Sequence, residues 1–127
     1  MTKKVSEKTA AVKDVSTPDK LADAVAQFLG EKKGRDITVI DISARSIIAD
    51  YFVIASATST TQVKALADYV DEKLSVGFGI EPLHRDSDKK WIAVDYGSVI
   101  VHIFYEEMRE FYQLERLWSD GTNTRKA

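Results

Sequence analysis

Two short apolar runs and the amphipathic pattern after them constrain the fold of this chain most strongly. The runs ITVIDI (37–42) and DYFVIASA (50–57) are rich in β-branched and aromatic residues, which is typical of strands. Both are apolar at nearly every position, which indicates strands covered on both faces. Ser59 and Gln62 then match a capping box, and an apolar stripe at helical spacing occupies residues 63–74. The pattern predicts a sheet with helices packed on it.

Other local patterns place elements before and after these. Thr17 and Pro18 are typical of a helix N-terminus, because Pro fits the first turn, where an N–H has no partner in the helix. Residues 91–96 and 98–105 flank a Tyr96-Gly97 turn and predict an antiparallel hairpin. The remaining expected elements are a first helix ending at Gly30 or Gly34, a strand at 80–84, and a helix that begins at Glu106 and stops before Asp120.

These elements give the order α-β-β-α-β-β-β-α and the fold class α/β (α+β). We expect a single mixed sheet of about five strands flanked by helices, in which the strand at 50–57, the next helix and the strand at 80–84 form a right-handed βαβ unit. A length of 127 residues suits one domain. Its predicted bounds are 18–119, between a flexible, lysine-bearing arm at 1–17 and a disordered tail at 120–127.

Composition disfavours several classes of function. The chain has no cysteine, which excludes disulfides, thiolate metal sites and cysteine nucleophiles and favours a cytoplasmic location. No apolar run has the length of a signal-peptide core or a membrane span. With 18 basic and 20 acidic residues and a formal charge of −2, nucleic-acid binding by phosphate neutralisation is disfavoured, and a basic protein is the better partner.

The two histidines are poor candidates for catalysis or metal binding. His102 shares a strand face with Ile100 and Phe104, which is typical of a packed histidine rather than a general base. His84 lies beside Arg85 in a polar segment, where a solvated side chain is expected. Neither has a second histidine at ligand spacing, so no zinc or iron site is predicted.

Carboxylates offer the alternative of an enzyme. Acids of the type that holds magnesium in phosphoryl-transfer sites are Asp41, Asp50, Asp68 and Asp95. A nucleotidyltransferase needs a Gly-Ser loop followed by paired acids on a strand, but Ser59 has no preceding Gly and Asp41 has no second acid two residues on. No Gly-rich loop opens a helix, so no cofactor is predicted. A small magnesium- or nucleotide-dependent transferase using Asp41, Asp50 or Asp95 is the alternative to a binding function.

The predicted hairpin carries the most informative alternation. Along its first strand, side chains point alternately to opposite faces: Ile92, Val94 and Tyr96 to one, and Trp91, Ala93 and Asp95 to the other. The first set suits a core. The second places a large aromatic near an acid, which suits a protein-binding patch for a basic partner, unless a helix covers Trp91 completely. The residues alone indicate a small α/β binding module that is not an enzyme, with both settings of Trp91 open.

Three segments in order resemble one known family. DYFVIASATSTTQVKALADYV, WIAVDYGSVIVHIF and REFYQLERLW together are similar to the ribosomal silencing factors, also called RsfS or Iojap, and the resemblance covers residues 18–119. It implies a translation regulator without enzymatic activity or cofactor, which binds the large ribosomal subunit at its protein fourteen and sterically blocks joining of the small subunit, chiefly when nutrients are short. It further implies a nucleotidyltransferase-like architecture without the catalytic acids, and a homodimer in the free state.

The resemblance also implies a contact surface. Trp91 matches the tryptophan of the family's hairpin motif, which belongs to the ribosomal contact, and Asp95 and Tyr96 lie in the same motif. Asp50 and Tyr51 match the family's strand motif, with a role at the interface, in a dimer contact, or in the structure alone.

One departure from the family pattern falls close to this surface. His84 and Arg85 stand where many members have Glu-Gly, which exchanges an acid for potential positive charge near the interface. His84 is therefore a further candidate for the interface or for a dimer contact. Either pairing with a basic ribosomal protein is weaker there, or the position lies outside that contact.

Overall fold

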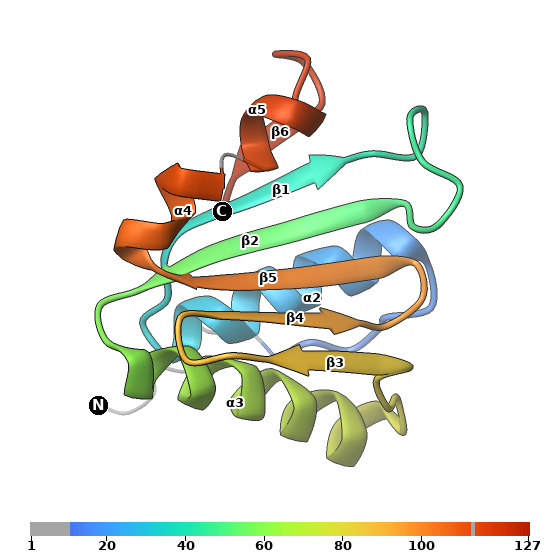
Figure 1. Ribbon diagram of the computed structural model, residues 1–127. Coiled ribbons are helices and arrows are strands. Elements are labelled where there is room, and N and C mark those ends of the chain that lie inside the picture. The colour runs from blue at the N-terminus through green and yellow to red at the C-terminus, as the bar shows by residue number, and fades with distance from the viewer. Residues whose placement is uncertain (1–10, 113) are drawn as a thin grey trace, which may run out of the picture.

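A mixed six-stranded sheet organises the part of the chain that the computed structural model describes, residues 11–112 and 114–127 (Figure 1). The elements are α2 (Pro18–Glu31), β1 (Arg35–Asp41), β2 (Tyr51–Ala57), α3 (Thr60–Phe78), β3 (His84–Ser87), β4 (Trp91–Asp95), β5 (Val99–Tyr105), α4 (Glu106–Tyr112), α5 (Leu114–Trp118) and β6 (Thr124–Lys126). The strand order is β3-β4-β5-β2-β1-β6, in which β2 and β5 are parallel and the other neighbours antiparallel. The predicted class of mixed sheet with flanking helices is confirmed.

Local signals set the ends of the two long helices. Thr17 is the N-cap residue of α2, followed by Pro18 in the first turn, as predicted. At α3 the Ser59 hydroxyl accepts from the backbone N–H of Gln62 at 3.1 Å, and the Gln62 side chain accepts from the N–H of Thr58 at 2.7 Å. The helix ends at Phe78, and the C-cap residue Gly79 has a φ of 68°, which suits a residue without Cβ.

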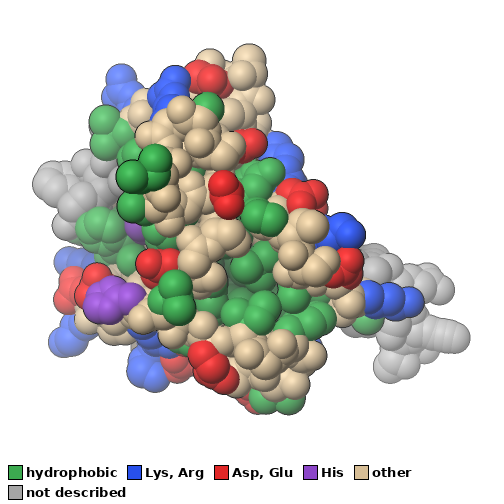
Figure 2. All heavy atoms as spheres, turned by 90° about the vertical axis from the view of Figure 1, so that its right-hand side faces the viewer, with side chains coloured by type: hydrophobic (Ala, Val, Ile, Leu, Met, Phe, Trp, Pro, Cys, Tyr) green, Lys and Arg blue, Asp and Glu red, His purple; other side chains and the backbone are tan. Residues whose placement is uncertain are grey.

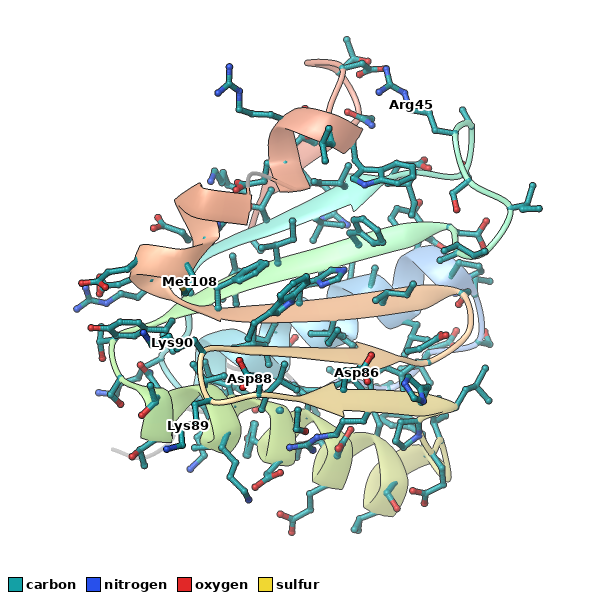
Figure 3. All side chains as sticks on the ribbon, viewed as in Figure 1. Arg45, Asp86, Asp88, Lys89, Lys90 and Met108 are labelled. Carbon is teal, nitrogen blue, oxygen red and sulfur yellow. The ribbon has the colours of Figure 1, made fainter. Side chains whose placement is uncertain are left out.

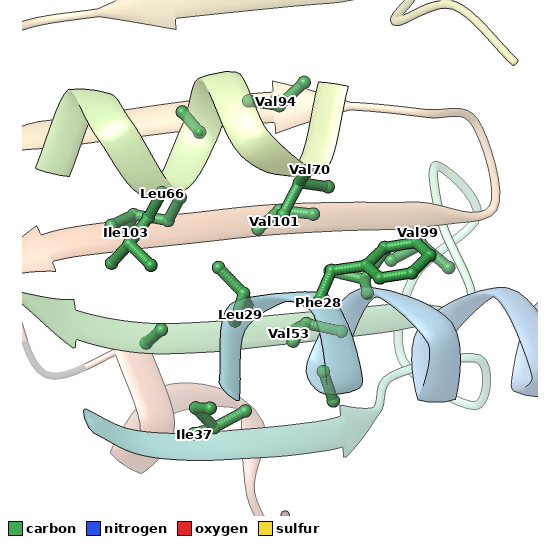
Figure 4. Packing of buried hydrophobic residues seen from close by; sticks show 14 of the residues in the cluster. Phe28, Leu29, Ile37, Val53, Leu66, Val70, Val94, Val99, Val101 and Ile103 are labelled. Atoms are coloured by element: carbon green, nitrogen blue, oxygen red, sulfur yellow. The ribbon is translucent and has the colours of Figure 1, made fainter. Parts of the chain in front are cut away.

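The main core lies between the sheet and the helices α2 and α3, which cover one of its faces. Figure 4 shows Phe28 and Leu29 of α2 and Leu66 and Val70 of α3 packed on the same side of the sheet as strand residues such as Val101. These side chains are almost completely buried. One face of each helix, which repeats every 3.6 residues, packs against one face of the strands, which repeats every 2 residues, and together they form one apolar layer.

Of the helices that the structure describes, only the short α4 and α5 lie on the opposite face of the sheet, where a buried arginine holds them in place. Arg109 of α4 is 8% exposed. Its guanidinium donates to the hydroxyls of Ser56 at 2.9 Å and Thr38 at 2.8 Å, and forms two bonds, of 3.0 and 2.9 Å, to the carboxylate of Glu115 in α5. Both short helices are thereby attached over β1 and β2.

The strand expected at 80–84 is wrong except for its last residue. The N–H of Ile80 bonds to the carbonyl of Leu74 at 3.0 Å as part of the α3 C-cap, and Pro82 has no N–H to donate to a sheet. Strand β3 therefore begins at His84. It lies next to β4, and the parallel neighbour of β2 is β5, so the βαβ unit does not join adjacent strands.

The C-terminal residues also differ from the expectation of a tail without structure. Gly121, with φ of 90°, turns the chain back after α5, and the side-chain amide of Asn123 donates to the carbonyls of Asp41 and Trp118, both at 2.9 Å. Strand β6 then pairs with β1, which gives the sixth strand. At the other terminus, Val12 and Val15 pack against the core; residues 1–10 of the predicted arm lie outside the described residues.

Leu66→Ala tests the helix-covered core. Leu66 is 0% exposed, and we expect the substitution to lower the free energy of unfolding by about 2–5 kcal/mol, because it removes packed atoms and leaves a cavity. The matched control is Leu83, which is 74% exposed. Leu83→Ala is expected to change the free energy of unfolding by less than about 0.5 kcal/mol. Urea unfolding at neutral pH measures both, and equal losses would contradict this account of the core.

Candidate functional site

The sheet leaves one area without a helix over it, which we call the open face. It consists of the β3, β4 and β5 side chains that point away from α2 and α3. Strand register places them in rows that pair His84 with Asp95, Asp86 with Ala93, and Trp91 with Phe104. The open face is turned toward the viewer in Figure 3, where Asp86 projects from β3, Lys89 and Lys90 from the turn after it, and Met108 lies at the side of α4. The area has the form of a docking surface rather than a cleft.

Trp91 is the largest side chain of the open face and is partly exposed. Its indole stacks on Phe104 with 5.0 Å between ring centroids, and its Nε1–H donates to Nδ1 of His102 at 3.2 Å. Met108 packs against the same small cluster from α4 without closing it. Of the two settings that the sequence left open, complete cover by a helix is excluded, and a partly exposed aromatic is found.

His102 lies beneath Trp91 and is a packed histidine, as predicted. It is 8% exposed, and the edge of Phe52 meets its ring with 4.8 Å between centroids. Burial lowers the pKa of His102 to about 4, since the charged form cannot be solvated there. The imidazole is neutral at pH 7, and because Nδ1 accepts from Trp91, the ring proton resides on Nε2.

The charged residues on the strands of the open face are mainly acidic, and Lys89 and Lys90 lie in the turn at its margin. Asp86 lies on it, 3.1 Å from Nε2 of the exposed His84, and Asp95 faces the same way while one of its oxygens accepts from the Gly97 N–H at 2.7 Å. The positive charge expected from Arg85 is not found here. Arg85 points to the other face and pairs with carboxylates of α3, so the open face keeps its acidic character.

Tyr96 lies on the helix-covered side of the hairpin. It is 7% exposed, and its hydroxyl donates to Asp71 of α3, so burial and this bond raise the pKa of Tyr96. Tyr51 is likewise packed against the helix-side core, and the backbone N–H groups of Asp50 and Tyr51 donate to the carbonyl of Ser98 at 2.8 and 3.0 Å. These three residues do not share the open face, whereas Trp91 does.

The structure therefore brings together Trp91, Asp95 and His84 of the residues selected from the sequence. Asp86 and Ile100 of the same face were missed, because their place depends on which strands become neighbours. The one local signal for Ile100 is the alternation of β5, which places Ile100 on the same strand face as His102.

The acids of the alternative transferase are not gathered. Asp41 ends β1 and Asp95 ends β4, with β2 and β5 between these strands. Asp41 accepts from the N–H and hydroxyl of Ser43 at 2.9 and 2.6 Å, as a turn-forming aspartate does. Within residues 11–112 and 114–127, no group of three or more His, Asp or Glu is placed to hold a metal ion.

Further apolar side chains are exposed away from the open face. They include Ile47 and Ile48 in the loop before β2, Val76 on α3, Leu83 before β3 and Leu117 on α5. Figure 2, which shows the flank at the right of Figure 1, has hydrophobic side chains interleaved with acidic, basic and other side chains. In the described part of the chain, no helix is both long and apolar enough to cross a membrane.

Fold and site together define a small α+β protein whose mixed sheet has one open face with a partly exposed tryptophan. A family model described as "Ribosomal silencing factor during starvation" matches residues 15–127, and the chain belongs to this family of ribosome-binding factors without enzymatic activity.

Individual relatives agree. The chain is 40% identical over 101 residues to a ribosomal silencing factor RsfS of Haemophilus influenzae, covering 76% of this chain and 99% of that one. It is 36% identical over 95 residues to the RsfS of Bacillus subtilis, covering 72% and 78%. A crystal structure of a Chromobacterium violaceum protein is similar with a TM-score of 0.72 and 31% identity, over 84% of this chain and 87% of the other. Mitochondrial relatives also occur, among them "Protein Iojap-related, mitochondrial" of Arabidopsis thaliana, 30% identical over 79% of this chain and 59% of that protein.

The buried His102 predicts a dependence of stability on pH. Its pKa is about 4 in the folded chain against 6.5 for the ordinary group, so between these values the unfolded state binds more protons. This contribution is fully present above pH 6.5 and is lost as the pH falls toward about 4. We expect the free energy of unfolding of the wild type to fall by about 3 kcal/mol more than that of His102→Leu over this range. Urea unfolding at several pH values measures the difference, and parallel curves would contradict it.

Proposed function

We propose that this protein binds the large ribosomal subunit and prevents the small subunit from joining it, which represses translation, notably in nutrient shortage. The contact on the large subunit is its ribosomal protein fourteen. Membership of the silencing factor family supports ribosome binding. The observation that carries the proposed surface is the partly exposed Trp91, which lies on a sheet area without a helix over it and on the same face as Asp86 and Asp95.

The open face has the properties of a specific protein contact. Tryptophan is enriched among the residues that dominate binding energy, and Trp91 stands on a rigid strand with Phe104 behind it. Acidic side chains around such an anchor favour a basic partner and disfavour an acidic one. A standard interface buries roughly 800 Å² on each partner, about a tenth of this chain's 7347 Å² surface. Strands of four, five and seven residues supply the centre of such an area, and side chains at their margins, such as Lys90 and Met108, would supply the rest.

Occlusion follows from the layered fold. A partner docked on the open face leaves the layer of α2 and α3 on the far side of the sheet, so the whole thickness of the domain projects from the docking site. No chemistry, metal or cofactor is needed for this mechanism.

The residues selected from the sequence divide into two roles in this proposal. Trp91, Asp95 and His84 are proposed to touch the ribosomal protein. Tyr96 and Tyr51 support the strands from the helix side, and Asp50 fixes the loop before β2.

We also propose that the free protein forms a homodimer through exposed apolar side chains, and that it acts in the cytoplasm. A dimer that uses the open face would have to separate before docking, so ribosome binding and self-association would compete. Sedimentation velocity over a concentration series, with and without Trp91→Ala, distinguishes a dimer through the open face from one through another surface.

Trp91→Ala tests the docking surface. We expect it to weaken binding to isolated large subunits by roughly thirtyfold or more, because it removes the central anchor. Val76→Ala, a truncation of an exposed side chain on α3, is the control and should bind like the wild type. Co-sedimentation with large subunits, small subunits and assembled ribosomes measures the effect. Undiminished binding by a folded Trp91→Ala protein would move the site elsewhere, and absence of wild-type binding to large subunits would refute the function.

Asp95→Asn tests the acidic character of the surface. Asparagine keeps an oxygen for the Gly97 N–H and removes the charge. We expect affinity for large subunits to fall about two- to fivefold at low salt, with a smaller loss at high salt, where charges are screened. Glu72→Gln removes an exposed acid from α3 and serves as the control. A loss that does not change with salt would argue against charge complementarity.

A further inference from the structure

Fold stability alone does not explain why a histidine occupies position 102. The ring is 8% exposed, and its Nε2 has no hydrogen-bond partner among the residues that the structure describes. A buried polar group without a partner destabilises a protein. The ring lies among Phe52, Phe104 and Trp91, where an apolar side chain would avoid this penalty.

The second ring nitrogen supplies the reason. Nδ1 of His102 accepts the indole N–H of Trp91 at 3.2 Å. Because a neutral imidazole has one donor and one acceptor nitrogen, acceptance at Nδ1 requires the proton to be on Nε2. The unsatisfied Nε2–H is thus the consequence of the bond to Trp91.

The rings of Phe52 and Phe104 fix the plane of the imidazole and the plane of the indole. Phe52 meets His102 edge-on, with an interplanar angle of 80°, and Phe104 lies nearly parallel to it at 11°. Trp91 stacks on Phe104 at an interplanar angle of 27°, which holds the plane of the indole. A half-turn about the Cβ–Cγ bond would keep that plane but reverse the edge that carries the N–H. The bond to His102 selects one of these two orientations.

We propose that His102 is a positioning residue for docking, which holds the Trp91 indole in a single orientation on the open face before a partner binds. The consequence for docking rests on the proposed function, and the positioning itself does not. An anchor already in its bound orientation loses less conformational freedom on binding. Removing the acceptor is therefore expected to weaken docking while the contact residues stay unchanged.

The test uses the full chain with two substitutions of similar burial. His102→Leu removes the acceptor, and His102→Asn can place its amide oxygen near the position of Nδ1. His102→Phe is the second acceptor-free variant in case the leucine protein does not fold. The indole N–H resonance of Trp91, identified by its loss in Trp91→Phe, is followed by ¹H–¹⁵N correlation spectra and hydrogen exchange. Affinity for isolated large ribosomal subunits is measured by co-sedimentation in the wild-type and Trp91→Phe backgrounds.

We expect the indole resonance to shift and to exchange faster in His102→Leu, with thermal stability at neutral pH equal to or above that of the wild type. Affinity for large subunits should fall about three- to tenfold, the range for one neutral hydrogen bond. His102→Asn should resemble the wild type in both measurements. In the Trp91→Phe background, which lacks the N–H, His102→Leu should cause no further loss of affinity.

One result would overturn the positioning of Trp91 by His102, and another would overturn its effect on docking. An unchanged indole resonance and exchange rate in the acceptor-free variants would show that His102 does not position Trp91. A changed resonance with wild-type affinity, or an equal loss of affinity in the Trp91→Phe background, would show that the orientation has no part in docking. If the wild-type protein does not bind large subunits, the proposed function and its docking consequence fail, while the resonance still decides the positioning.

Discussion

The unequal cover of the two sheet faces is the constraint on which the rest of the structure depends. Helices α2 and α3 bury one face along β1, β2, β4 and β5, whereas on the other face α4 packs against β2 and β5 and the short helices do not extend over β3 and β4. Arg109 sets that limit, because its buried guanidinium must stay near Thr38 and Ser56 to be satisfied. Its partner Glu115 then keeps α5 at the same place, and β4 is left with one face open.

The alternation of the hairpin divides its residues between two tasks. Arg85 of β3 points toward α3 and pairs with Asp68 and Asp71, while its neighbours along the strand, His84 and Asp86, point to the open face. A single-residue step along the chain therefore separates a residue that anchors the sheet from one that is available to a partner. This explains how a basic residue is accommodated at position 85 without changing the sign of the docking surface.

Local patterns were sufficient for α2, β1, β2, α3, β4 and β5, but not for β3, β6 or the exposure of Trp91. The capping box at Ser59, the continuous apolar strands and the Tyr96-Gly97 turn act between residues close in sequence, so they can be recognised without the fold. The composition of the open face could not be predicted in this way, because it depends on strand register and on the side to which helices pack. β6 was missed because its pairing is with a strand more than eighty residues earlier, and its three residues carry no periodic pattern. The family resemblance places Tyr96 at the contact with Asp95, whereas strand alternation predicts, and the structure shows, its side chain on the opposite face.

The margins of the sheet have a consequence for how the protein behaves at high concentration. β1 would present a long, apolar row of unpaired backbone groups, but β6 closes it with Arg125 and Lys126 among its residues. At the other margin β3 is only four residues long and reads His-Arg-Asp-Ser, a charged sequence that is a poor template for another strand. Growth of the sheet by strand addition is thus blocked at both ends. An exposed aromatic on the face of a sheet is tolerable in a soluble chain when the sheet cannot also extend sideways into aggregates.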